Sequence, residues 1–196
     1  MSTTASPARR YTPDDLLAMP DGDRYELVDG RLVETPMSFD SSECALAIGS
    51  LIRAACLADG SGRVAGPDCG YQCFPAHPGR VRRPDVSFLR ADRLPAPDRR
   101  AAGFILVRPD LAVEVVSPTD RAYDLQEKLD DYRDAGIPLV WVVYPPSRRI
   151  RILRADGSTA EVGPEDELTG EAVLPGFRCR VADLFAGLPG AAVAGG

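Results

Sequence analysis

The chain has 196 residues, of which 44% are hydrophobic and 27% are charged, with a formal net charge of −6 and a pI near 4.9. This composition is typical of a soluble globular protein and argues against one that coats nucleic acid non-specifically, because such proteins are basic. The longest apolar run, around "IPLVWVVY", is far shorter than the ~20 residues of a membrane helix. We therefore expect a cytoplasmic protein with no membrane partner.

The chain length predicts one domain over residues 11–187, with a disordered leader (1–10) and a flexible tail (188–196). The leader has no apolar stretch after its basic residues, unlike a signal peptide. The five cysteines form no CxxC pair and there is one histidine, so reduced core cysteines are favoured over a zinc site.

In chain order, Pro13 after Thr12 predicts a short helix that Pro20 stops, and Asp29-Gly30 predicts a hairpin. An apolar-rich helix ending at Gly60 follows. The later segments predict strands at 63–66, 71–75, 82–90 and 110–117, and a loop at 91–109, either irregular throughout or with a short helical turn. An amphipathic helix is predicted at 117–136, a buried strand at 138–145 and an edge strand at 148–157. Small strands and a short helix near "VADLFAG" follow.

The succession of strand, helix and strand from 110 to 144 predicts a right-handed crossover between two adjacent parallel strands. Because hairpins precede and follow it, the sheet should be mixed. The predicted fold class is therefore α/β, with a mixed central sheet flanked by helices and with additional β-hairpins.

Glu114 lies in the middle of the strongly apolar strand "DLAVEVVS". An unpaired carboxylate buried there would cost several kcal/mol or would take up a proton. A buried ion pair or an exposed strand end would remove that cost, and so would a divalent cation. The last alternative makes Glu114 a candidate metal ligand.

Asp85 follows Pro84 at the start of the strand "RRPDVSFL". It is either a turn or strand-cap aspartate, or a second carboxylate at the same end of the sheet as Glu114. Two such carboxylates would form a Mg²⁺ site that waters and a substrate phosphate complete.

Lys128 is the only lysine among 23 basic residues, and it lies on the flank of the apolar face of the helix at 117–136. It is either a solvated partner of Asp124 or a group that extends its ammonium towards the sheet. Arginine would serve the first role equally well. A site that needs a compact ammonium would not accept arginine.

An aspartate after proline, then a strand glutamate and a lysine, resembles the PD-(D/E)XK nuclease superfamily. More closely, the chain resembles the Uma-type restriction endonuclease family through "YTPDDLLAMP", "RYELVDGRLVE", "RRPDVSFL", "LPGFRCRVADLF" and the long segment from "LAVEVVSPTD" to "LVWVVYP". Strict E-x-K spacing would place lysine where Val116 stands. In the Uma-type proteins the lysine is on the following helix, and that position is Lys128. A histidine frequent at the start of the long helix is absent from "SFDSSECAL".

The resemblance implies an endonuclease that hydrolyses phosphodiester bonds with Mg²⁺, or Mn²⁺ in its place. It implies Asp85 and Glu114 as metal ligands and catalytic residues, with Lys128 near the attacking water. It also implies auxiliary roles for Glu26, which is otherwise a structural hairpin residue, and for Asp124, which would orient Lys128.

The arginines of "GRVRRPD", Arg80, Arg82 and Arg83, are candidate contacts to nucleic-acid phosphates, or else solvated loop charges. DNA is the expected partner, and a homodimer would suit double-strand cutting. Two alternatives stay open: an inactive or weakly active nuclease-fold domain that binds nucleic acid or a protein, and a metal hydrolase acting on a small phosphorylated molecule.

Overall fold

The computed structural model describes residues 9–101 and 103–188. Most of the predicted leader (1–10) and tail (188–196) therefore lies outside the described residues. Helix α1, Pro13–Ala18, begins with a capping box in which Thr12 and Asp15 exchange hydrogen bonds. Strands β1, Tyr25–Val28, and β2, Arg31–Glu34, form the predicted antiparallel hairpin.

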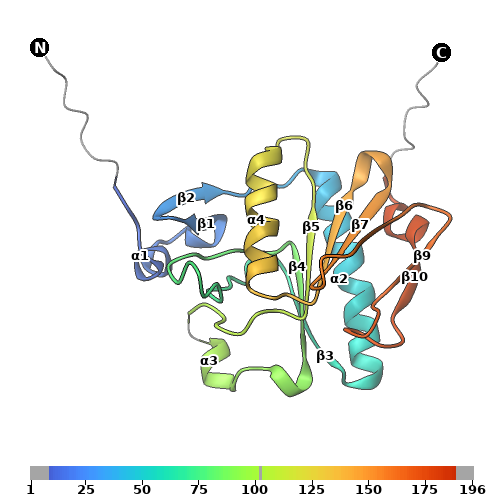
Figure 1. Ribbon diagram of the computed structural model, residues 1–196, viewed down its shortest axis with the longest axis horizontal. Coiled ribbons are helices and arrows are strands. Elements are labelled where there is room, and N and C mark those ends of the chain that lie inside the picture. Colours follow the sequence, from blue (N-terminus) through green and yellow to red (C-terminus); the bar gives the residue numbers. More distant parts are fainter. Residues whose placement is uncertain (1–8, 102, 189–196) are drawn as a thin grey trace, which may run out of the picture.

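A six-stranded mixed sheet forms the centre of the protein (Figure 1). Strands β5 and β6 are parallel and adjacent, as predicted, and every other pair in this sheet is antiparallel. The fold class is confirmed: a mixed central sheet flanked by helices, with extra hairpins. In spatial order the strands are β3 (Gly62–Ala65), β4 (Val86–Arg90), β5 (Leu111–Val115), β6 (Leu139–Tyr144), β7 (Arg149–Arg154) and β8 (Thr159–Val162).

Two helices cover opposite faces of this sheet. Helix α2, Phe39–Asp59, packs against the face that carries Val113 and Val115 of β5. Helix α4, Ala122–Asp134, packs against the face that carries Ala112. Because side chains alternate along a strand, Glu114 lies on the same face as Ala112 and is directed towards α4.

Helix α2 begins after the N-cap Ser38 and ends at Gly60, whose positive φ of 69° suits a left-handed C-cap. Its 21 residues are long and apolar enough to cross a membrane by length and composition, although the apolar runs of the sequence did not predict such a segment. One side, including Ile48 and Ile52, is buried in the core. The other side exposes Leu46 and Leu57.

Two predicted strand assignments are wrong. Strand β7 is not an edge strand, because β8 pairs along it and is the edge of the sheet. Residues 71–75 form no strand; Tyr71 makes only isolated bridges to Arg82 and Ile105. The predicted loop at 91–109 contains the short helix α3, Pro97–Ala101.

A second hairpin closes the core on the α2 side. Strands β9, Glu167–Thr169, and β10, Arg178–Arg180, pair antiparallel, and a 3₁₀ helix at Val181–Phe185 follows. Leu168 of β9 and Phe185 are fully buried in the cluster that contains the α2 face. The late small strands and short helix thus complete this layer.

The close approach of β3 to β4 gives a stability prediction. A Cβ at Gly62 would lie 2.2 Å from the carbonyl oxygen of Leu89, whereas a Cβ at Gly66 would have no neighbour within 4 Å. We expect Gly62→Ala to lower the free energy of unfolding by roughly 1–3 kcal/mol through overpacking. Urea unfolding measures this, with Gly66→Ala as the matched control. Equal stability of the two variants would contradict the prediction.

Candidate active site

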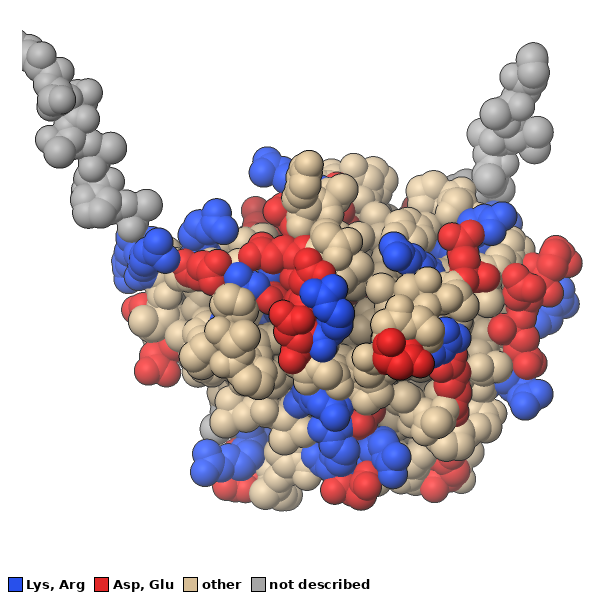
Figure 2. All heavy atoms as spheres, in the orientation of Figure 1, with Lys and Arg blue, Asp and Glu red and all other residues tan. Residues whose placement is uncertain are grey.

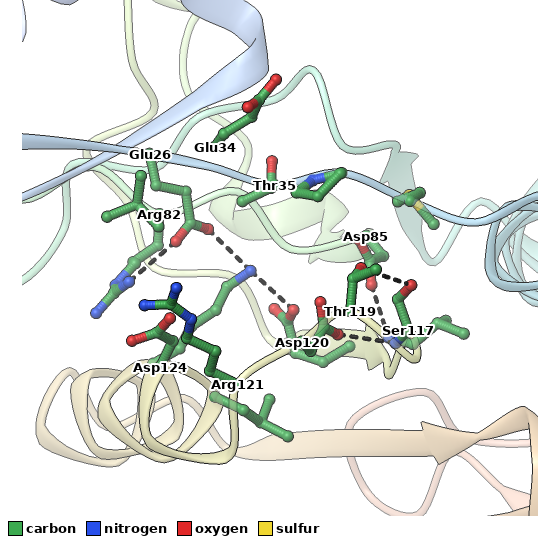
Figure 3. Close-up of a pocket in the computed structure, with 17 residues that line it drawn as sticks. Glu26, Glu34, Thr35, Arg82, Asp85, Ser117, Thr119, Asp120, Arg121 and Asp124 are labelled. Atoms are coloured by element: carbon green, nitrogen blue, oxygen red, sulfur yellow. Dashed lines mark hydrogen bonds and ion pairs between the residues drawn. The ribbon is translucent and has the colours of Figure 1, made fainter.

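A cavity of about 370 Å³ opens where the hairpin β1–β2, the start of β4, the end of β5 and the start of α4 meet (Figure 3). We call it the carboxylate cavity, because six of the residues that line it are acidic and three are basic. The acidic residues are Glu26, Glu34, Asp85, Glu114, Asp120 and Asp124, and the basic residues are Arg82, Arg121 and Lys128.

Glu114 reaches the cavity from β5 and is 5% exposed. Its Oε2 accepts a hydrogen bond from Lys128 Nζ at 2.7 Å, and its Oε1 accepts one from the Tyr132 hydroxyl at 2.6 Å. Lys128 and Tyr132 are four residues apart, so one face of α4 presents both donors. The buried carboxylate is thus held in a buried ion pair at the edge of the cavity.

The ammonium of Lys128 is directed into the protein and not into solvent. Besides Glu114, it contacts Glu26 Oε1 at 2.8 Å and donates to the backbone carbonyl of Arg83 at 2.9 Å. An ammonium has three donors, and these three acceptors come from three separate segments of the chain. Lys128 therefore joins α4 to β5, to β1 and to the segment that precedes β4.

Asp85 stands between Pro84 and the first residue of β4 and is half-buried. Its Oδ2 accepts a hydrogen bond from the backbone N–H of Val115, at 2.6 Å. This bond attaches the start of β4 to the end of β5 and directs Asp85 to the cavity that Glu114 lines. Asp85 is thus both a strand-terminus aspartate and a cavity residue.

Burial and charge set the protonation of this cluster. Burial raises the pKa of Glu114 to about 8, despite the opposing effect of Lys128. Burial also raises the pKa of Asp85, and the charges of Glu26 and Asp120 add to this effect. Burial disfavours the ammonium of Lys128, but the carboxylates of Glu114, Glu26 and Asp85 outweigh it and raise its pKa. Burial therefore favours the neutral forms of Glu114 and Asp85, and the neighbouring Lys128 does not fully offset it.

Glu26 is the exception among these carboxylates. Burial opposes its charge, but Lys128 and Arg82 together hold its pKa below the ordinary value. Arg82 donates to Glu26 Oε2 at 2.9 Å, and the backbone N–H of Arg83 donates to Oε1 at 2.7 Å. Glu26 is thus a charged residue that connects the hairpin to the cavity wall.

The three arginines predicted to contact phosphates are buried, at 6% exposed for Arg80, 2% for Arg82 and 6% for Arg83. Arg80 and Arg82 both pair with Asp131 of α4. Arg83 donates to backbone carbonyl groups, including that of Tyr25 at 3.0 Å. In this arrangement their guanidinium groups are not free to bind phosphate, because protein acceptors already surround them.

Asp124 lines the cavity, but within the described residues no hydrogen bond or ion pair joins it to Lys128. No direct contact between these two side chains therefore supports the predicted role of Asp124 in orienting Lys128. Lys128 is oriented by Glu114 and Glu26 instead.

Sequence reasoning missed two features of the site. By its spacing Tyr132 belongs to the apolar face of α4, which hides that its hydroxyl, one turn after Lys128, contacts the same carboxylate. The loop after β5 supplies Ser117, Asp120 and Arg121 to the cavity. Asp120 accepts from the Ser117 N–H at 2.8 Å, a turn signal that "SPTD" carries in the sequence.

The donor chemistry of the cavity fits a hard divalent cation, since carboxylate oxygens are the preferred ligands of Mg²⁺. Burial raises the pKa of both Asp85 and Glu114, so a bound cation would favour their charged forms. In the arrangement described, however, no three His, Cys, Asp or Glu side chains within residues 9–101 and 103–188 are grouped to hold a metal ion.

Comparison with known proteins supports a nuclease-like α/β domain. A family model, Uma2, described as "Putative restriction endonuclease", matches residues 13–182, and the chain belongs to this family. A solved structure from Anabaena variabilis ATCC 29413, described as a putative nuclease belonging to DUF820, has a TM-score of 0.77 at 19% identity. The match covers 89% of this chain and 97% of that chain, and it shows the shared fold. No curated protein matches the chain.

The burial of Arg82 leads to a prediction about stability. Arg82→Met would leave Glu26 and Asp131 buried without a full partner, so we expect a loss of roughly 3–5 kcal/mol in the free energy of unfolding. Arg149→Met is the control, because its pair with Glu161 is exposed and should contribute no more than ~1 kcal/mol. Urea unfolding measures both. Equal stability of both variants, with weakened DNA binding only in Arg82→Met, would instead support the phosphate-contact role.

The raised pKa of Glu114 leads to a prediction about pH. Between the ordinary value of 4.5 and about 8, the folded state binds a proton that the unfolded state has released. The contribution of Glu114 to stability therefore falls as pH rises through this window. We expect Glu114→Gln to lose less stability than the wild type over the same window.

Urea unfolding at a series of pH values tests this. Exposed Glu165→Gln is the control for removing one negative charge from the chain. Parallel stability curves for the wild type and Glu114→Gln would contradict the prediction.

Proposed function

We propose that the protein is a metal-dependent endonuclease that hydrolyses phosphodiester bonds, with DNA as substrate, at the carboxylate cavity. The observation that carries the proposal is the convergence of Asp85, Glu114 and Lys128 on one cavity with an excess of carboxylates. Membership of the restriction endonuclease family supports a nuclease-like function.

Asp85 and Glu114 are the residues that would hold Mg²⁺, or Mn²⁺ in its place. Once bound, such an ion neutralises the phosphodiester and helps to activate a water. The hydrogen bond from Val115 N–H leaves the second oxygen of Asp85 for this role. Each oxygen of Glu114 accepts one hydrogen bond and retains a second lone pair that could bind the ion.

Lys128 contributes a buried positive charge beside the reacting phosphate. A fixed cation stabilises negative charge that develops in the transition state, because no solvent has to reorganise around it. Tyr132 positions Glu114 by donating to Oε1. Arg121, exposed at the cavity, is available to a phosphate oxygen of the substrate.

The alternative is a nuclease-fold domain that binds nucleic acid or a protein without cutting. One observation favours it: both oxygens of Glu114 already accept from protein donors. Binding and cleavage therefore have to be measured separately.

The experiment incubates the wild type, Asp85→Asn, Glu114→Gln and Lys128→Met with plasmid, linear duplex and single-stranded DNA. Each is tested with Mg²⁺, with Mn²⁺ and with EDTA. We expect cleavage by the wild type only with metal, and a loss of about 10²–10³ in rate for each variant. Asp85→Asn and Glu114→Gln weaken the binding of the metal, and Lys128→Met removes the cation beside the phosphate.

Glu161→Gln, an exposed change on β8, is the control variant. Thermal unfolding checks that every variant is folded. Cleavage that persists in EDTA, or in all three variants, would contradict the proposed site. Tight DNA binding without cleavage on any substrate would establish the binding domain instead.

A further inference from the structure

A second cavity of about 360 Å³ adjoins the carboxylate cavity, between α2 and β3. The two cavities share Met37 and Asp85 in their walls, so they adjoin at Asp85, and we call the two together the path. We call the second cavity the apolar groove, because Leu46 of α2, Val64 of β3 and Val86 of β4 line it.

Small residues shape the apolar groove. Gly49 of α2 faces Val86, and a Cβ at Gly49 would lie 3.7 Å from the methyl groups of Val86. Gly66, just after β3, has open space where a Cβ would stand. The groove is therefore lined largely by aliphatic side chains and glycine backbone, a lining that suits an apolar ligand such as a base.

The charge changes sign along the path. Asp85 is the only acidic residue among the described residues that line the groove, and Arg53 is its basic residue. The exposed Arg53 side chain makes no ion pair or hydrogen bond within residues 9–101 and 103–188. A further hollow continues from Arg53 and Val64 to Arg63, which is also exposed and equally unpaired within those ranges.

These arginines contrast with the surface over α4. Figure 2 shows acidic side chains gathered over α4, where Asp124 and Asp134 are exposed. On the side of α2 and β3, Arg53 and Arg63 are cations without a protein partner among the described residues, and they can attract a phosphate of the strand. The direction of the path away from the carboxylate cavity is therefore along α2.

We propose that the apolar groove is a nucleobase subsite that takes one unpaired base of the substrate strand next to the phosphate at Asp85. A nucleic-acid strand alternates anionic phosphates with flat, largely apolar bases. The path has the matching order: the proposed phosphate site at Asp85, then the apolar groove, then the cation of Arg53. The guanidinium of Arg53 stacks on the base or contacts the following phosphate, as arginine does in single-strand recognition.

This inference rests on the proposed function and narrows its substrate to single-stranded or locally unwound nucleic acid. Bases in a duplex are stacked and paired, so their faces cannot enter a slot unless the strand opens. Binding in EDTA tests the subsite without cleavage, and thus independently of catalysis.

The test measures the affinity of the full chain for a short labelled oligothymidylate, for the same strand with one abasic position, and for a duplex of equal length. Gly66→Leu fills the groove, and Gly79→Leu is its matched control, because a Cβ there also has no neighbour within 4 Å. We expect Gly66→Leu to bind the single strand about tenfold more weakly than the wild type, with duplex binding and Gly79→Leu unchanged.

The abasic probe isolates the base itself. The wild type should lose affinity when one base is removed, whereas Gly66→Leu should show no further loss, because the groove is already closed. Arg53→Met, an exposed change that does not depend on repacking, should weaken single-strand binding and reduce its salt dependence by about one phosphate contact.

Unchanged affinity of both Gly66→Leu and Arg53→Met for the single strand would overturn the subsite. So would equal affinity of the wild type for intact and abasic strands. Metal-dependent cleavage of duplex DNA alongside either result would leave the proposed nuclease function standing. If the protein shows the expected binding pattern but cleaves no substrate, the nuclease proposal is contradicted and the base subsite is supported.

Discussion

The buried ammonium of Lys128 is the interaction on which the site depends. It contacts Glu114 of β5, Glu26 of β1 and the carbonyl of Arg83, and so it joins the central sheet, the N-terminal hairpin and α4 at one point. A compact ammonium can direct three donors to acceptors in three directions, whereas a guanidinium is a planar fork. This difference gives a physical reason for one lysine in a chain whose other basic residues are all arginines.

The N-terminal hairpin belongs to the site through charge as well as through apolar packing. It forms no strand pair with the central sheet, and Glu26 connects it to Lys128 and Arg82. Arg82 in turn pairs with Asp131 of α4. Buried charges of this kind tolerate little displacement, because a lost partner leaves an uncompensated charge in the protein. The hairpin and α4 therefore hold a common wall of the carboxylate cavity in place.

The arginines divide into two groups with different physical roles. Those of "GRVRRPD" are buried: Arg80 and Arg82 neutralise carboxylates inside the protein, and Arg83 donates to backbone carbonyls. Arg53, Arg63 and Arg121 are exposed and line neighbouring cavities that share wall residues. An acidic protein can thus present a local basic track, because its net charge does not fix where each unpaired charge lies.

The sequence by itself determined the fold class, the crossover from β5 to β6, and the candidates Asp85, Glu114 and Lys128. Alternation along β5 and the apolar face of α4 are local patterns, and they require Glu114 and Lys128 to approach each other across one sheet face. Only the tertiary structure decided that Arg80, Arg82 and Arg83 are buried and that Tyr132 contacts Glu114. It also decided that β8 covers β7. The burial of a charged side chain depends on partners far away in the chain, such as Asp131 for Arg82, and periodicity carries no information about such partners.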